Sequence, residues 1–74
     1  MMINIQDIIP FMKDGWVAMD SDGSWWLYNE KPELICIFGT TTPCDWYFIG
    51  KRFALTNIAP AEDWTKSLIK VGGK

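Results

Sequence analysis

Two short apolar runs flank an Asp-Gly pair in residues 16–28, WVAMDSDGSWWLY, and form the clearest hydrophobic pattern in the chain. Three of the five tryptophans lie in this stretch. An Asp-Gly pair between apolar runs is typical of a β-hairpin turn, because glycine adopts positive φ without the clash of a Cβ atom. The pattern therefore predicts two strands joined at Asp22 and Gly23, with the rest of the chain packed around them.

Two turns fit this sequence, and they pair the strands differently. A two-residue type I′ turn at residues 22–23 pairs Met19 with Trp26. A type I turn over residues 20–23, with Gly23 as the left-handed residue of a bulge, pairs Met19 with Trp25. We favour the bulged turn, because an aspartate and a glycine then stand at the first and fourth positions, where type I turns prefer them.

The register decides which aromatic side chains face the core, since a slip of one residue moves every side chain to the other face of the sheet. In the bulged register the core face is aliphatic apart from one tryptophan, and the second face carries two tryptophans and a tyrosine. The core face comprises Val17, Met19, Trp25 and Leu27, and the second face comprises Trp16, Ala18, Trp26 and Tyr28. In the other register Trp25 moves to the second face.

A short helix is predicted before the hairpin. Isoleucines at positions 5, 8 and 9 and a methionine at position 12 follow the spacing of a buried helical stripe. Pro10 would cost about 3 kcal/mol in a helix interior if Asn4 were the N-cap, but it is tolerated in the first turn if Asp7 is the N-cap. We therefore expect a helix near residues 8–13, ended by Gly15.

The remaining pattern predicts three strands and a second helix. Residues 34–38 form a continuous apolar run, as in a central strand, followed by strands at residues 46–49 and, more weakly, 52–58. Pro60, Glu62 and Asp63 suit the first turn of a helix that ends at residues 72–73. The expected fold is one α+β domain over residues 1–74, a small twisted antiparallel sheet of four to five strands with a short N-terminal helix and a C-terminal helix. An SH3-like small barrel is the alternative.

Composition excludes several kinds of chemistry. The chain has no histidine, which removes histidine-dependent nucleophilic catalysis and most zinc sites. Asp20, Asp22 and Asp45 are interpreted as turn and loop formers rather than as a carboxylate cluster. The net charge is −2 and the lysines are scattered, which disfavours nucleic-acid binding. We expect no enzyme, no catalytic residue, no metal and no cofactor.

The N-terminus lacks a secretory pattern, and no apolar run is long enough for a membrane span. The expected location is therefore the cytoplasm, the host cytoplasm if the chain is encoded by a phage. Cys36 and Cys44 are then expected to be free thiols, with a disulfide as the less favoured alternative. Cys36 lies in an apolar run and is interpreted as a small buried hydrophobe.

Aromatic residues are the candidate binding surface. If helices cover only one face of the sheet, Trp16, Trp26 and Tyr28 should remain partly accessible. Exposed tryptophan and tyrosine are typical of interfaces, and arginine at their edge would add a charge. The predicted binding residues are Trp16, Trp26, Tyr28, Trp46 and Arg52. The alternatives are that these aromatics belong to the core or that they fill an interface between copies of the chain.

Two segments, IIPFMKDGWVAMDSDGSWWLY and IAPAEDWTKSLI, resemble small proteins encoded by bacteriophages and prophages. The layout is also similar to that of the phage anti-Thoeris sponge proteins. That resemblance implies an N-terminal helix, an antiparallel sheet, oligomerisation and sequestration of nucleotide-derived immune signals without cleavage. The segment WVAMD has no Lys or Arg where that family has a basic strand, so no binding residue is transferred from it.

These observations predict a non-enzymatic phage accessory protein that counters host defence. It would bind a defence protein or sequester a small nucleotide-type signal, and a homo-oligomer is expected. No membrane partner is expected. The alternatives are an assembly module that acts through homo-oligomerisation, or a single-stranded nucleic-acid binder that stacks bases on tryptophan and tyrosine.

Overall fold

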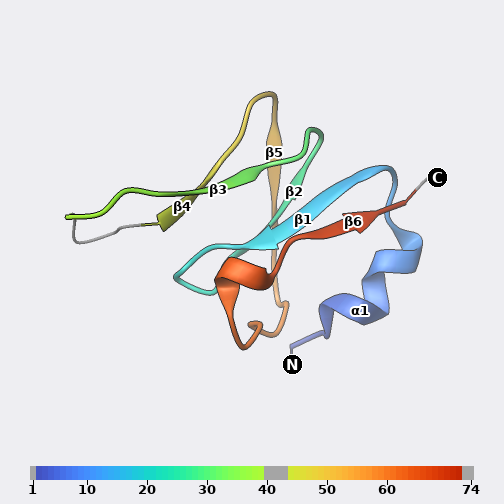
Figure 1. The fold of residues 1–74 in the computed structure, drawn as a ribbon. Coiled ribbons are helices and arrows are strands. Elements are labelled where there is room, and N and C mark those ends of the chain that lie inside the picture. The colour runs from blue at the N-terminus through green and yellow to red at the C-terminus, as the bar shows by residue number, and fades with distance from the viewer. Residues whose placement is uncertain (1, 40–43, 73–74) are drawn as a thin grey trace.

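The computed structural model describes residues 2–39 and 44–72 and shows an α+β fold (Figure 1). Helix α1 (Ile5–Ile8) and the 3₁₀ turn η1 (Ile9–Phe11) precede a four-stranded antiparallel sheet with the order β5-β2-β1-β6. A separate two-stranded sheet is formed by β3 and β4. The strands are β1 (Gly15–Met19), β2 (Trp25–Tyr28), β3 (Glu33–Cys36), β4 (Cys44–Tyr47), β5 (Arg52–Leu55) and β6 (Ile69–Val71), and the 3₁₀ turn η2 is Trp64–Lys66.

The β1–β2 hairpin has the bulged register that its turn sequence favours. Met19 pairs with Trp25, and Val17 pairs with Leu27. The Gly23 N–H donates to Asp20 O over 2.9 Å, while the Asp20 N–H donates to Ser24 O over 2.8 Å. Gly23 has φ of 90°, a conformation that suits glycine. The predicted division of the hairpin into two faces is therefore confirmed.

The N-terminal helix begins earlier than expected. Asn4, not Asp7, is the N-cap of α1, and its side-chain oxygen accepts from the Gln6 N–H over 2.9 Å. The helix ends at Ile8. Pro10 lies in the first turn of η1, where a backbone N–H would have no partner within the helix, so the N–H that proline lacks is not needed. A helix over residues 8–13 is thus wrong. Dividing the segment into two short turns resolves the conflict between the Asn4 cap and Pro10.

The predicted C-terminal helix is also wrong. Within residues 60–72 only the single turn η2 is helical, and the chain then extends into β6, which pairs with β1 through Val17↔Ile69 and Gly15↔Val71. The alternation Ile-Lys-Val suits an edge strand, because it buries Val71 while Lys70 remains exposed. Pairing with a strand more than 50 residues away in sequence outweighs the local helix signals at Pro60 and Glu62.

Both faces of the four-stranded sheet are covered. On the first face, Ile5 of α1 packs with Val17, Met19, Trp25 and Val71. On the second face, Ala18 and Tyr28 pack with Trp46 from the β3–β4 hairpin, which extends away from the main sheet (Figure 1). The run at residues 34–38 is therefore not a central strand, because β3 pairs with β4 alone. β5 and β6 are the two edges of the main sheet, so the described residues do not close into a barrel.

Cys36 and Cys44 form a disulfide, so the expectation of free thiols is wrong. They lie directly opposite each other at the ends of β3 and β4. Cys36 is also exposed rather than buried. The antiparallel pairing of β3 with β4 brings the two Cα atoms within 3.9 Å, a proximity that the eight-residue separation in sequence does not reveal. Most of the intervening loop, residues 40–43, lies outside the described residues.

Candidate binding surfaces

The predicted aromatic binding residues belong to the second core cluster or pack against it, rather than forming an open aromatic face. Tyr28 is 0% exposed and Trp46 is 6% exposed, while Trp16 and Trp26 are half-buried. The expectation that Tyr28 remains accessible is wrong, because the β3–β4 hairpin covers the face that helices do not reach. In this conformation a partner can contact only the exposed parts of Trp16, Trp26 and Arg52.

Arg52 is engaged within the fold. Its guanidinium carbon lies 3.9 Å from the centre of the Trp26 ring and 4.9 Å from that of Phe48. Its Nη1 lies 3.6 Å from Asp20 Oδ2. The β2–β5 pairing sets Arg52 opposite Tyr28, whose ring meets Phe48 edge-on at 5.2 Å. Arg52 therefore forms cation–π contacts with two aromatic rings and an ion pair with Asp20, so its charge is not free.

Burial shifts the pKa values of two polar groups near Arg52, the Asp20 carboxyl and the Tyr28 hydroxyl. Burial raises the pKa of the Asp20 carboxyl; Arg52 opposes this shift, and the charges of Asp45 and Asp22 add to it. Burial also raises the pKa of the Tyr28 hydroxyl. Among the described residues, Asp20 Oδ1, Trp26 Nε1 and Tyr28 Oη have no hydrogen-bond partner of regular geometry, although the Trp26 N–H is placed to favour the ionised Asp20. This cluster packs the second face of the sheet.

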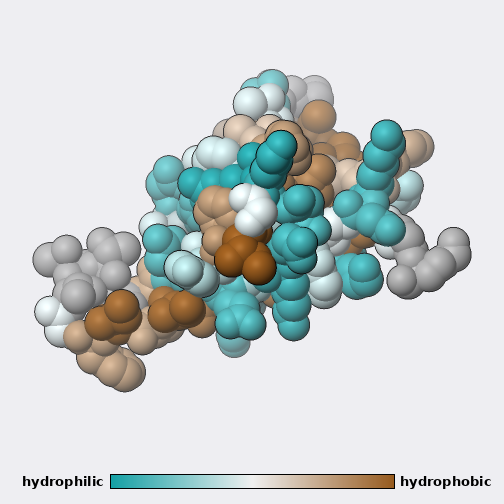
Figure 2. All heavy atoms as spheres, turned by 90° about the horizontal axis from the view of Figure 1, so that it is seen from above, coloured by the Kyte–Doolittle hydropathy of each residue, from teal (hydrophilic) through white to brown (hydrophobic). Residues whose placement is uncertain are grey.

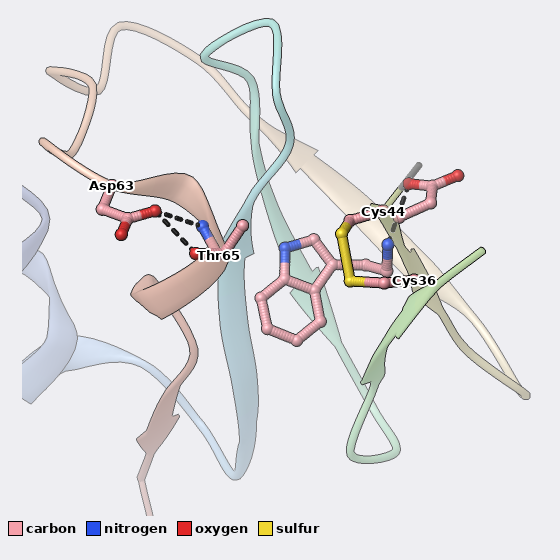
Figure 3. The surroundings of a disulfide bond; sticks show 6 residues. Cys36, Cys44, Asp63 and Thr65 are labelled. Atoms are coloured by element: carbon pink, nitrogen blue, oxygen red, sulfur yellow. Dashed lines mark hydrogen bonds between the residues drawn. A yellow bond between two sulfur atoms is a disulfide. The ribbon is translucent and has the colours of Figure 1, made fainter. Parts of the chain in front are cut away.

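Trp46 fixes the hairpin to the main sheet. Its Nε1–H donates to Met19 O over 3.0 Å, and the Ser67 hydroxyl accepts from the Met19 N–H over 2.8 Å. The Trp46 side chain is also buried, so its ring is not available for stacking on a ligand. Figure 3 shows this region, with the Cys36–Cys44 disulfide on one side and the Asp63–Thr65 cap of η2 on the other.

Trp16 packs against the second core cluster and lies close to two lysines. Lys31 Nζ is 5.5 Å from the centre of the Trp16 ring, and Lys70 Nζ is 5.1 Å from it. Lys70 is the cross-strand neighbour of Trp16 on β6. Trp16 is also the cross-strand partner of Tyr28, which in turn lies opposite Arg52, so the structure keeps these three side chains in one row across the sheet.

A group of exposed large apolar side chains outside the predicted binding residues lies on the β3–β4 hairpin, residues 33–47, which we call the arm; exposed Phe11 and Phe53 lie elsewhere. Phe38 is 92% exposed. Figure 2 shows hydrophobic side chains at the end of the molecule that the arm occupies. Exposed large hydrophobic residues on the arm and directly after it are Ile35, Ile37, Phe38, Tyr47 and Ile49. The apolar run at residues 34–38 was noticed in the sequence, but an unbroken apolar run is typical of a buried strand and so predicted burial rather than exposure.

A shallow groove of about 450 Å³ lies between the base of the arm and η2. Its apolar part includes buried Pro32 and Trp46 and half-buried Leu34 and Leu68. Its polar rim consists of Lys31, Glu33, Thr65 and Lys66. The groove therefore combines an apolar floor with two lysines and one glutamate.

Comparisons with protein-family models, with curated proteins and with solved structures gave no match. Within residues 2–39 and 44–72, no group of three or more acidic or cysteine side chains is placed to hold a metal ion. No helix in the same residues has the length and apolarity needed to cross a membrane.

Proposed function

We propose that this chain is a non-enzymatic binding protein that engages a partner protein through its arm. The observation that carries the proposal is the exposure of Phe38 and its apolar neighbours on a projecting hairpin. Monomeric proteins rarely expose large contiguous apolar surface, and aromatic side chains contribute much of the energy of protein interfaces.

The disulfide supports this role of the arm. A two-stranded hairpin is marginally stable alone, and the Cys36–Cys44 bond closes it near its tip. At its base, Trp46 anchors it through the hydrogen bond to Met19 O. A hairpin ordered before binding loses less conformational entropy when it meets a partner, so its apolar side chains contribute more to affinity.

We further propose that the partner is a host-defence protein and that the chain is a phage accessory protein acting in the host cytoplasm. This part rests on the resemblance to phage-encoded proteins alone. Between the two modes considered for such a protein, we favour protein binding over sequestration of a nucleotide-type signal. Tyr28 and Trp46, which would have stacked on a base, are buried.

The test uses a photo-crosslinking residue at position 38 and, as a matched control, the same residue at exposed Lys13. In extract from the natural host, the position-38 probe should capture a defined protein that the position-13 probe does not. Adding Ile35→Ser to the position-38 protein should reduce that capture. Equal capture from both positions, or capture that is unaffected by Ile35→Ser, would contradict the proposal.

The competing proposal is that the arm binds a second copy of the chain. Native mass spectrometry distinguishes a second copy from a different partner protein. If wild-type protein forms a dimer that Phe38→Ser converts to monomer, the arm binds a second copy and the chain is an assembly module. If both proteins are monomers, the arm is free for a different partner.

A further inference from the structure

We infer that two copies of the chain associate through β5, whose open edge pairs with the same edge of a second copy in antiparallel orientation. The two four-stranded sheets then continue into one another across a two-fold axis. This surface belongs to the main sheet and not to the arm, so the inference does not depend on the role proposed for the arm.

The hydrogen bonds between β2 and β5 show which backbone groups face the open edge. Among the described strands, β5 is outermost and pairs with β2 alone. The Asn29 N–H donates to Lys51 O over 3.2 Å, one pair beyond the end of β5. Bonded and non-bonded pairs alternate along an antiparallel ladder, so the backbone groups of Arg52 and Ala54 point away from β2. They lie where a further strand would bond.

The side chains of β5 do not block pairing at this edge. Proteins protect open strand edges with lysine, proline or a bulge. The other edge strand of the main sheet, β6, carries the exposed Lys70 at its centre. The central residues of β5 are Phe53 and Ala54, which are exposed and uncharged, and its one charged side chain, Arg52, is engaged within its own subunit. The edge of β5 is therefore better suited to association than that of β6.

The side chains of β5 also fit an identical strand. With Phe53 on the two-fold axis, Arg52 of one copy lies opposite Ala54 of the other, and the outward backbone groups of both residues can bond. The two phenylalanines then form a close cross-strand pair, which covers side chains that are 55% exposed in one copy. The small Ala54 leaves room for Arg52, and the two arginines do not oppose each other. A second copy thus supplies a complementary strand.

Sedimentation velocity and native mass spectrometry of the disulfide-bonded protein, over a range of concentrations, test the inference. Wild type should dimerise, and so should Phe38→Ser, because the arm is not part of this contact. Ala54→Pro removes an outward N–H without removing a bond to β2, and should raise the dimer dissociation constant roughly tenfold or more. Lys70→Pro, the same change at the centre of β6, is the matched control and should leave dimerisation unchanged.

Amide exchange followed by NMR locates the contact. The Arg52 and Ala54 amides should be protected in the dimer, and the Arg52 amide should lose protection in Ala54→Pro. The Phe53 amide bonds to β2, so its protection should persist and shows that the variant is folded. Phe53→Lys opposes two lysines across the axis and should also be monomeric, whereas Phe11→Lys, at an exposed phenylalanine of η1, should still dimerise.

Several results would overturn the inference. They are a wild-type protein that is monomeric at every concentration, a dimer that survives both Ala54→Pro and Phe53→Lys, and a dimer that Lys70→Pro dissociates. A dimer lost in Phe38→Ser but kept in Ala54→Pro would place the contact on the arm. If the Arg52 and Ala54 amides became protected only on addition of another protein, the strand that covers β5 would belong to a different chain, and the inference would again be wrong.

Discussion

At the scale of single residues, the second face of the sheet is held together by Arg52. Its guanidinium lies against the Trp26 and Phe48 rings and next to the Asp20 carboxylate. Asp20 also begins the hairpin turn, so one aspartate joins turn formation to packing of the second face. A side chain predicted to be a surface charge therefore contributes to the order of the fold.

Gly23 is required for the turn that sets the register. Gly23→Ala should lower the free energy of unfolding by about 1 kcal/mol, since φ of 90° strains an L-residue. The added Cβ would meet no atom closer than 3.9 Å, so backbone strain is the cause. Gly23→Asn should cost less, because asparagine tolerates left-handed conformations. Urea unfolding checks this, and an unchanged midpoint for Gly23→Ala would show that the turn does not need glycine.

Trp25 and Trp26 are neighbours in sequence but pack on opposite faces. Trp25→Ala should cost about 3–5 kcal/mol, because its side chain is buried and its Nε1–H donates to Ala59 O. Trp26→Ala should cost less, since Trp26 is half-buried and stacks on Arg52. Trp26→Phe, which keeps an aromatic ring, should recover part of the loss. A larger loss for Trp26→Ala than for Trp25→Ala would contradict the assigned faces.

The contributions of Asp20 and Asp63 to the free energy of unfolding should change with pH in opposite directions. Burial raises the pKa of Asp20 above its ordinary 3.8, so the folded state binds a proton more readily than the unfolded state. The free energy of unfolding of wild type, relative to Asp20→Asn, should therefore rise as pH falls through the raised pKa toward 3.8. Hydrogen bonds from the Thr65 hydroxyl and N–H lower the pKa of Asp63 below 3.8.

For Asp63 the sign is reversed. Its stabilising contribution is present above pH 3.8 and is lost as pH falls through the lowered pKa of the folded state. Wild type relative to Asp63→Asn should therefore lose stability in acid. Urea midpoints of the three proteins between about pH 3 and pH 7 give both differences. The same sign for both variants would show that the environment of one carboxyl is misassigned.

At the scale of elements, the arm and the four-stranded sheet are stabilised by different interactions. The main sheet is stabilised by cores on both faces, whereas the arm depends on Trp46 at its base and the disulfide near its tip. Local opening of a hairpin needs far less free energy than global unfolding.

Reduction should therefore act on the arm more than on the sheet. Closing a short loop contributes about 2 to 3 kcal/mol in the chain-entropy treatment. The Cys36→Ser, Cys44→Ser protein should show faster amide exchange in β3 and β4, with little change in β1 and β2. Hydrogen exchange followed by NMR makes the comparison. If β1 and β2 exchange faster by the same factor as the arm, the two units unfold together.

The state of the cysteines is also directly measurable. Protein isolated without reductant should resist alkylation by iodoacetamide, and treatment with a dithiol should expose two reactive thiols. Mass spectrometry distinguishes the two forms. If the chain acts in the cytoplasm, as proposed, cellular thiols would tend to open this bond. Alkylation in intact cells would then show whether Cys36 and Cys44 are oxidised to the disulfide or reduced to thiols where the protein acts.

At the scale of the whole molecule, a short chain builds two core clusters on one sheet. Its axes of 39, 28 and 17 Å describe an elongated body, consistent with an arm that projects from the sheet. A small domain has little apolar surface to spare, and this supports the proposal that the exposed hydrophobic side chains of the arm form an interface.

Substitution of the most exposed arm residue should separate binding from folding. Phe38→Ser should leave the free energy of unfolding within about 0.5 kcal/mol of wild type, because its side chain is 92% exposed. It should weaken partner binding or self-association by roughly tenfold or more. Calorimetry and native mass spectrometry give the two quantities. A large loss of stability would show that Phe38 packs within the fold and is not part of an interface.

The sequence alone determined the features that depend on neighbouring residues. The Asp-Gly turn predicted the hairpin and favoured the bulged register, from which the two faces of the β1–β2 hairpin follow, because turn geometry and a period of two act locally. The α+β class and the start of β5 at Arg52 were also predicted. Tertiary structure decided the rest, because pairing between distant segments outweighs local propensity. β1 recruits residues 69–71 as a strand instead of a helix, and β3 with β4 brings Cys36 to Cys44. The same hairpin buries Tyr28 and Trp46, and so moves the candidate binding surface from the aromatic face to the arm.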